Sequence, residues 1–208
     1  MDSLELDSPA KLNLSLSVLS KRTDGMHEIQ TQFQLINLCD EILIKKTIEK
    51  LVTLKINEPL KLGLSSSELL EFEENNIISD AILALSEHTG REINCEIEIT
   101  KNIPLGGGLG GGSSNAAAVL IGTNYLFNLG LSVEELMKLG RKLGADVPFF
   151  IYGKNAYASG IGEIFIEEKN YIDEKYLLLF PQIHSSTKEF FSKWDSLNKS
   201  DQESILIN

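Results

Sequence analysis

Between Ile103 and Leu120 the sequence reads IPLGGGLGGGSSNAAAVL, with six glycines around a single leucine. Glycine loses more backbone entropy on folding than other residues, so such a run needs a loop in which the backbone turns sharply or approaches a ligand. The segment EINCEIEIT before it alternates polar and apolar residues, and the alanine-rich segment after it favours a helix. We therefore expect a strand, a glycine loop, and a helix from about Ser113 to Phe127.

Three common nucleotide-binding glycine loops do not match this one. A P-loop needs a lysine before its Ser/Thr, whereas Ser113 directly follows Gly112. A dinucleotide-binding loop can be traced through Gly106, Gly108 and Gly111, but it should follow a strand that is apolar on both faces. A protein-kinase loop is followed by a strand rather than a helix. The remaining interpretation is a cradle of backbone N–H groups at a helix N-terminus, which binds phosphate without a basic side chain.

The overall charge restricts the partners of the chain. Its 208 residues carry a formal net charge of −11, which disfavours non-specific binding to nucleic acid or to anionic membranes. Only two cysteines occur, Cys39 and Cys95, and both fall in predicted strands, where a small buried side chain is the common role. With no basic and apolar leader and no apolar run of membrane-spanning length, the sequence predicts a cytoplasmic protein.

The remaining periodicities predict a mixed α+β fold. Polar and apolar residues alternate over Ala10–Val18 and again over His27–Leu35, as in half-buried strands. Ser132 and Glu135 form a capping box that starts a helix ending near Gly144. The other expected strands are DEILIKK, KLVTLKI, DVPFFIYG and KYLLLFPQI, and the other expected helices are NNIISDAILALSEHTG and STKEFFSKWDSL. A change in composition near Glu167 to Lys175 marks the expected domain boundary.

Four segments in order resemble the GHMP small-molecule kinases. PLGGGLGGGSSNAA is similar to the phosphate-binding motif of that family, and the other three are SPAKLNLSLSV, KRTDGMHEIQTQFQLINLCDEI and LGADVPFFIYGKNAYASGIGE. The resemblance is strongest to the members that use ATP and Mg²⁺ to phosphorylate the 2-hydroxyl of a cytidine diphosphate methylerythritol in non-mevalonate isoprenoid biosynthesis. It implies an enzyme with a small-molecule substrate.

The same resemblance implies a two-domain fold. Residues 1–167 correspond to the ATP-binding and catalytic domain, which is like domain 2 of ribosomal protein S5. Residues 168–208 correspond to the start of a ferredoxin-like C-terminal domain that is incomplete in this sequence. No feature of the sequence predicts an oligomeric state.

The resemblance also assigns the catalytic residues. Asp146 matches the family's catalytic base, although a loop aspartate between apolar neighbours can equally serve as a cap. Lys11 matches the lysine beside the reacting hydroxyl, where a cation offsets developing negative charge. Asn13 shares a strand face with Lys11 and is expected to orient the substrate.

A second group of residues matches the part of the family site that holds the cytosine. His27 is expected to contact the edge of the base, and Phe191 to stack on its face, with Phe190 as a rival for that role. Met26 stands where the family commonly has an aromatic residue, and its thioether can still pack against a ring.

The ATP phosphates are expected to bind along the glycine loop. The hydroxyl of Ser113 or Ser114 is expected to reach Mg²⁺, and Lys101 and Asn76 are expected near the nucleotide, although both also have ordinary structural explanations. The loop residues concerned are Pro104, Leu105, Gly106, Gly107, Gly108, Leu109, Gly110, Gly111, Gly112, Ser113 and Ser114.

One family motif is not found in the sequence. GHMP kinases have a third glycine- and serine-rich motif in the C-terminal domain, and the segment ASGIGE resembles it only superficially. Two alternatives to the leading assignment follow. The chain is a truncated, inactive nucleotide-binding fragment of such a kinase, or it is a GHMP kinase with another substrate.

Overall fold

The computed structural model describes residues 1–49, 52–57, 76–168, 174–179 and 187–197. Along the chain the elements are β1 (Ser3–Lys21), β2 (His27–Lys46), β3 (Val52–Asn57), α2 (Ile77–Thr89), β4 (Cys95–Thr100), α3 (Gly111–Leu126), α4 (Val133–Leu143), α5 (Val147–Tyr152), β5 (Ala156–Ser159), β6 (Ile164–Glu167) and α6 (Thr187–Ser196). The α+β class predicted from the sequence is confirmed. In the part of the chain that the structure describes, no helix is both long and apolar enough to cross a bilayer.

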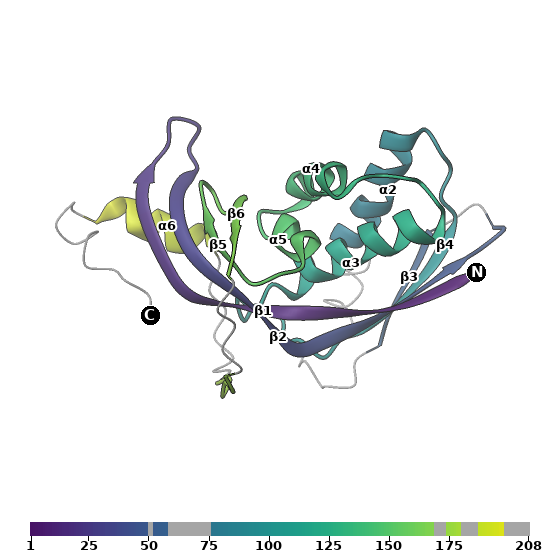
Figure 1. Cartoon of the computed structure of the whole chain (residues 1–208), viewed down its shortest axis with the longest axis horizontal. Helices are drawn as coiled ribbons and strands as arrows, with labels where there is room; N and C mark the ends of the chain where they lie inside the picture. Colours follow the sequence, from purple (N-terminus) through teal and green to yellow (C-terminus); the bar gives the residue numbers. More distant parts are fainter. Residues whose placement is uncertain (50–51, 58–75, 169–173, 180–186, 198–208) are drawn as a thin grey trace.

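The strands form one mixed sheet around a long hairpin. Its order is β3-β4-β2-β5-β6, and β1 pairs with β2 along nearly its whole length. Strands β3 and β4 are parallel, and the other pairs are antiparallel. One half of β2 therefore pairs with β4 and the other half with β5, so the hairpin runs from one end of the molecule to the other (Figure 1).

Helices α2 to α5 lie together on one side of the sheet (Figure 1). The alternating apolar residues of β4, Cys95, Ile97 and Ile99, are fully buried beneath them. Helix α3 approaches β1 so closely that a Cβ built on Gly122 would overlap Leu6 Cδ1. This contact fixes the helix that follows the glycine loop against the first strand.

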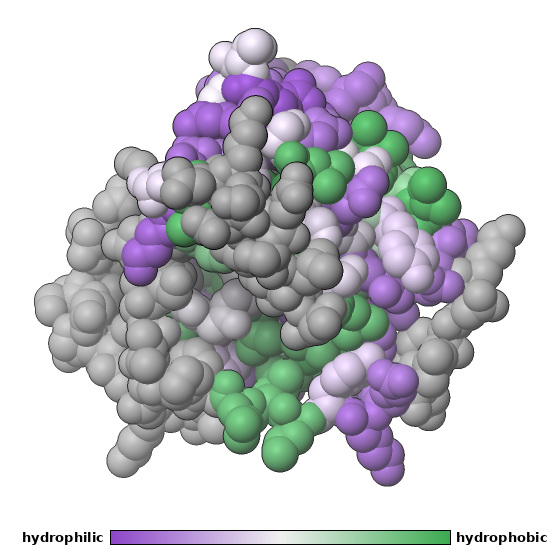
Figure 2. Space-filling model, turned by 90° about the vertical axis from the view of Figure 1, so that its left-hand side faces the viewer, coloured by the Kyte–Doolittle hydropathy of each residue, from purple (hydrophilic) through white to green (hydrophobic). Residues whose placement is uncertain are grey.

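The hairpin curves, and α6 lies beside its far end (Figure 1). The β1–β2 register shifts at three places, between Pro9 and Ala10, Asn13 and Ser15, and Val18 and Ser20. Such irregularities bend a strand pair and increase its twist. Viewed from this end, the surface shows apolar patches among hydrophilic ones (Figure 2).

Two expectations about local structure are wrong. The segment DVPFFIYG forms helix α5 rather than a strand, with a proline in its first turn and a left-handed glycine, Gly153, at its end. In KYLLLFPQI, the residues that the structure describes form no strand, and Leu177 and Leu179 are exposed rather than buried. The rest of that segment lies outside the described residues.

The other predicted elements are present. The helix expected from Ser113 begins at Gly111, two residues earlier, and the helix over STKEFFSKWDSL is α6. Two strands expected separately, over His27–Leu35 and DEILIKK, are one continuous strand, β2. The domain boundary expected near residue 167 stays a prediction: β6 ends at Glu167, and residues 169–173 lie outside the description.

Candidate functional site

The glycine loop turns repeatedly through left-handed backbone conformations. Gly106, Gly108 and Gly110 have φ angles of 70°, 71° and 73°, which L side chains rarely adopt. Gly110 is also the N-cap of α3 and supplies no side-chain cap. The first N–H groups of α3 therefore have no capping side chain, which is the arrangement that binds anions at a helix N-terminus.

Close packing holds this loop against the strands. The Lys11 backbone N–H donates to the Leu109 carbonyl at 2.9 Å. A Cβ built on Gly110 would lie 2.8 Å from the Phe150 ring, so helix α5 allows no side chain there. The loop therefore lies between β1 and α5, which carry the two predicted catalytic residues near the points of contact.

Lys11 and Asp146 face each other across this junction. The Lys11 Nζ atom lies 3.6 Å from Asp146 Oδ2. Lys11 is 5% exposed, donates to Asn13 Oδ1 and lies over the Phe33 ring, 5.4 Å from its centroid. Asp146 occupies the N-cap position of α5 without making a side-chain cap. Its carboxylate is thus available for chemistry rather than used in capping the helix.

A cavity of about 640 Å³ extends from this pair to the far end of the hairpin. It is large enough for a small ligand. Its lining includes predicted site residues from five segments of the chain, Lys11, Asn13, Met26, His27, Gly108, Asp146 and Phe191. The structure therefore brings the predicted catalytic and substrate-binding residues to one cavity, beside a glycine of the predicted phosphate loop.

At the far end of the cavity, His27 is held by residues of α6. Its Nε2 atom lies 2.8 Å from Asp195 Oδ1. Since a carboxylate only accepts hydrogen bonds, Nε2 is the donor. The Phe191 ring stacks on the imidazole with 4.5 Å between centroids, and Trp194 meets its edge at 5.4 Å. Because the two rings are stacked directly on each other, a cytosine ring cannot lie between His27 and Phe191. The space open to a cytosine ring is the cavity itself.

The charge of Asp195 is stabilised by its neighbours. The hydrogen bond from Lys21 has the largest effect and lowers the pKa of the Asp195 carboxyl. The hydrogen bond from His27 lowers this pKa further. Asp195 therefore remains ionised over a wide pH range and keeps α6 attached to the tip of the hairpin.

Lys101 and Asn76, both predicted near the nucleotide, have structural partners. Lys101 is buried and forms an ion pair with Asp40, and it also donates to Asn115 Oδ1 at 2.9 Å. Asn76 is the N-cap of α2 and accepts from the Ile78 N–H at 2.9 Å. Contact of either residue with a nucleotide stays a prediction. Lys101 lies close to the loop, since its Nζ is 3.4 Å from a Cβ built on Gly111.

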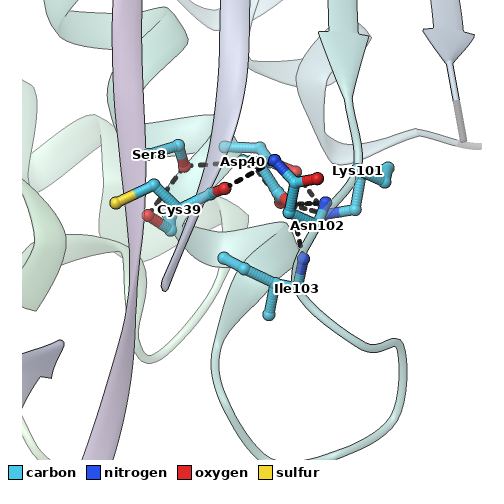
Figure 3. Close-up of polar contacts among 8 residues, drawn as sticks. Ser8, Cys39, Asp40, Lys101, Asn102 and Ile103 are labelled. Carbon is cyan, nitrogen blue, oxygen red and sulfur yellow. Dashed lines mark hydrogen bonds and ion pairs between the residues drawn. The ribbon is translucent and has the colours of Figure 1, made fainter. Parts of the chain in front are cut away.

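Several contributors to the site were missed by sequence reasoning. Asp195 follows Phe191 by four residues, a spacing that places both on one side of a helix and could have suggested it. Ser8 and Asn115 lie inside two of the segments that carry the family resemblance, and Figure 3 shows the buried polar contacts of this region. Asp40 lies inside a third such segment, KRTDGMHEIQTQFQLINLCDEI, but its partners are about 60 residues away, so the segment alone does not indicate its contacts.

The arrangement suits the transfer of a phosphoryl group to a hydroxyl. A carboxylate beside an ammonium group can accept the hydroxyl proton while the cation offsets negative charge. The glycine loop beside them offers backbone donors for phosphates. Among the described residues, no group of three or more His, Cys, Asp or Glu side chains gathers as a metal site would require.

Comparison with known proteins gives consistent matches. The GHMP kinases N terminal domain matches residues 76–154. The 4-diphosphocytidyl-2-C-methyl-D-erythritol kinase of Francisella tularensis subsp. holarctica is 43% identical over 202 residues, which are 97% of this chain and 68% of that one. The kinase of the same name from Ruthia magnifica is 43% identical over 90% of this chain and 62% of its own length.

Solved structures agree with these relatives. A crystal structure of 4-(cytidine 5'-diphospho)-2C-methyl-D-erythritol kinase superposes with a TM-score of 0.61 at 36% identity, covering 79% of this chain and 55% of that one. A mevalonate kinase shares the fold at 18% identity, with a TM-score of 0.66 over 96% of this chain and 68% of that one. The chain thus spans about two thirds of the length of these curated relatives and 55% of the length of the first solved kinase.

Proposed function

Because this chain belongs to the family of 4-diphosphocytidyl-2-C-methyl-D-erythritol kinases within the GHMP kinases, we propose that its substrate is 4-diphosphocytidyl-2-C-methyl-D-erythritol. The reaction transfers the terminal phosphoryl group of ATP to the 2-hydroxyl and leaves ADP. The observation that carries the proposal is the single cavity lined by Lys11, Asp146 and Gly108 at one end and by His27 and Phe191 at the other.

In this proposal Asp146 accepts the proton of the 2-hydroxyl as the oxygen attacks phosphorus. The geometry supports this role, because the carboxylate lies at the cavity and makes no helix cap. Lys11 lies 3.6 Å from it and stabilises the negative charge that develops on the reacting oxygens. The Asn13 side-chain oxygen accepts a hydrogen bond from Lys11 and thereby helps to orient the Lys11 ammonium group.

The residues from Pro104 to Ser114 hold the phosphates of ATP. Their backbone N–H groups and the N-terminus of α3 supply a local positive field in a chain whose formal net charge is −11. The donor set fits Mg²⁺, which binds phosphate oxygens and water with few protein ligands. Of the two hydroxyls expected to reach the ion, that of half-buried Ser113 would hold it, because Ser114 is buried and accepts from Ser8 Oγ at 2.8 Å. The ion, when bound, neutralises charge on the phosphates.

At the far end of the cavity, the cytosine lies against Met26 and Phe191. Met26 is partly exposed and lines the cavity together with His27. With Nε2 of His27 donating to Asp195, Nδ1 is the ring atom left to contact the base edge. We propose this arrangement as the source of selectivity for a cytidine diphosphate.

The test is release of ADP by the purified chain in the presence of ATP and Mg²⁺. We expect turnover with 4-diphosphocytidyl-2-C-methyl-D-erythritol and none with mevalonate or homoserine. Turnover on either of those alcohols alone would contradict the proposed substrate. Binding of a non-hydrolysable ATP analogue without any turnover would instead support the alternative of an inactive nucleotide-binding fragment.

A further inference from the structure

Asp40 is a buried carboxylate with contacts to both ends of the glycine loop (Figure 3). Its Oδ1 accepts the backbone N–H groups of Asn102 at 2.7 Å and Ile103 at 2.8 Å, where the loop begins. Its Oδ2 accepts from Lys101 Nζ, and from Asn115 Nδ2 at 2.9 Å in the first turns of α3. One side chain of β2 therefore connects the start of the loop to the helix at its end.

Asn115 extends this network to β1. Its Nδ2 also donates to Ser8 Oγ at 2.9 Å, and Ser8 in turn donates to Ser114 Oγ at 2.8 Å. Its Oδ1 accepts from Lys101. Each of the five side chains in the network is at most 1% exposed. The two central strands, the loop and α3 are thus joined by a polar network without solvent contact.

Stability alone does not account for this arrangement. A buried ion pair gives up the hydration of two charges, and apolar residues of similar volume often give equal or greater stability. An apolar side chain, however, cannot accept two consecutive backbone N–H groups while it also holds a helix. What Asp40 provides and an apolar residue cannot is a fixed position of the two loop ends relative to each other. These ends touch, because a Cβ on Gly111 would lie 3.1 Å from Ile103 Cγ2.

We propose that Asp40 is a positioning residue that sets the affinity for the nucleotide. A cradle built from backbone N–H groups binds phosphate only when the donors converge, and small displacements cost much of that affinity. By holding both ends of the loop, Asp40 keeps the donors convergent before the nucleotide arrives. This inference rests on the ATP site of the proposed function, and it concerns a residue that lines neither the loop nor the cavity.

Two substitutions at position 40 remove the contacts of Asp40 in two steps. Asp40→Asn keeps an oxygen that can accept the Asn102 and Ile103 N–H groups, but its NH2 group replaces the oxygen that accepts from Lys101 and Asn115. Asp40→Leu removes all of these acceptors. We expect calorimetry to show a dissociation constant for a non-hydrolysable ATP analogue about tenfold weaker for Asp40→Asn, which loses the link to α3, and weaker still for Asp40→Leu, which also loses the link to the start of the loop. The dissociation constant of the cytidine substrate should stay unchanged in both.

Asn115→Leu and Asn124→Leu complete the design. Asn115→Leu cuts the link between Asp40 and α3 while leaving the ion pair, and it also should weaken analogue binding about tenfold. It keeps the proposal testable if Asp40→Leu does not fold. Asn124 bonds the Leu131 backbone twice at 3.0 Å near the other end of α3, so Asn124→Leu should lower the melting temperature without weakening analogue binding.

The outcomes are distinct. If the Asp40→Leu and Asn115→Leu chains that fold bind the analogue as tightly as the unmodified chain, the positioning role is wrong while the kinase proposal stands. Loss of analogue affinity in Asn124→Leu, in proportion to lost stability, would also overturn the role. If the unmodified chain does not bind the analogue, the proposed function itself fails.

Discussion

Asp146 gives a direct test of the catalytic pair at the scale of a single residue. Asparagine has nearly the same shape but cannot accept a proton at neutral pH. We expect Asp146→Asn to lower kcat by about 10²–10⁴-fold, the usual contribution of a positioned general base. Affinity for an ATP analogue should change little, because the phosphates are proposed to bind the glycine loop.

The control for this variant is Asp80→Asn, which removes an exposed carboxylate in the first turn of α2. It should leave kcat unchanged. Turnover by Asp146→Asn close to that of the control would show that Asp146 is not the base.

Cys95 provides a pH-dependent prediction. Burial raises the pKa of its thiol from 9.0 to about 11. In this range the unfolded chain loses the thiol proton and the folded chain keeps it, so the free energy of unfolding falls as the pH rises from about 9 to 11. Two pKa units correspond to a loss on the order of 2 kcal/mol. Urea unfolding at several pH values measures it.

Cys95→Val removes the titrating group and preserves an apolar side chain of similar size. The decline in stability between these pH values should be shallower in this variant by the stated amount. Equal slopes for both proteins would show that the buried thiol makes no difference to the pH dependence.

Residues with local sequence signals were identified in advance, whereas residues defined by distant contacts were missed. Lys11, Asp146 and the glycine loop lie in segments whose order resembles a family, and the structure places all of them around one junction. Asp40 also lies in such a segment, but its partners, like those of Asp195, come together only when strands and helices far apart in the chain meet. Neither periodicity nor spacing contains that information.

At the scale of elements, the errors have a physical cause. The run PFFIY is apolar throughout, and a short apolar run is compatible with a buried strand or a buried helix. Pro148 in the first turn and Gly153 in a left-handed C-cap fit helix α5. Strands with clear alternation, such as β4, were predicted correctly because period two leaves no such ambiguity.

Gly110 tests whether the phosphate loop depends on its close packing. Gly110→Ala places a methyl group 2.8 Å from the Phe150 ring at a φ of +73°. We expect a loss of ATP-analogue affinity of at least about tenfold, because the loop must move away from α5 and from its phosphate-binding geometry. Calorimetric titration with the analogue measures this loss.

Gly130→Ala is the matched control. Gly130 has a φ of +77°, but nothing lies within 4 Å of its Cβ position. The same backbone strain should lower stability by about 1–2 kcal/mol without affecting nucleotide affinity. Similar affinity losses in both variants would indicate that strain, rather than the contact with Phe150, controls the loop.

The capping box of α4 predicts a stability effect away from the site. The Ser132 hydroxyl accepts from the Glu135 N–H at 3.2 Å, and the Glu135 carboxylate accepts from the Ser132 N–H at 2.8 Å. Ser132→Ala should lower the free energy of unfolding by about 1 kcal/mol, measured by urea denaturation. Ser20→Ala, at an exposed strand position, should have no comparable effect.

At the scale of the whole molecule, the cavity is assembled from parts with different support. The main apolar core joins the sheet to α2 through α5. Helix α6 instead contacts the hairpin tip through Asp195, which bonds both Lys21 and His27. The end of the cavity proposed to bind cytosine is therefore stabilised by a few contacts of α6. The end proposed to bind phosphate is stabilised by the main apolar core.

Asp195→Asn should loosen α6 selectively. It removes the charge that pairs with Lys21 and weakens the bond to His27. We expect faster amide hydrogen exchange in α6 and unchanged exchange in α3, measured by mass spectrometry. Since the lowered pKa of Asp195 keeps it ionised down to acidic pH, the unmodified protein should show the same loosening only as the pH falls through that pKa. Asp80→Asn serves again as the control, and equal exchange in α6 for both variants would contradict this role.

The register shifts of the hairpin have a geometric consequence. Lys11 pairs with Leu35 and Lys21 with His27, so β1 uses ten residue steps where β2 uses eight. Two strands of unequal length joined at both ends form an arc with the longer one following the longer path. The curvature that brings the hairpin tip toward the catalytic pair is thus encoded in a difference of two residues.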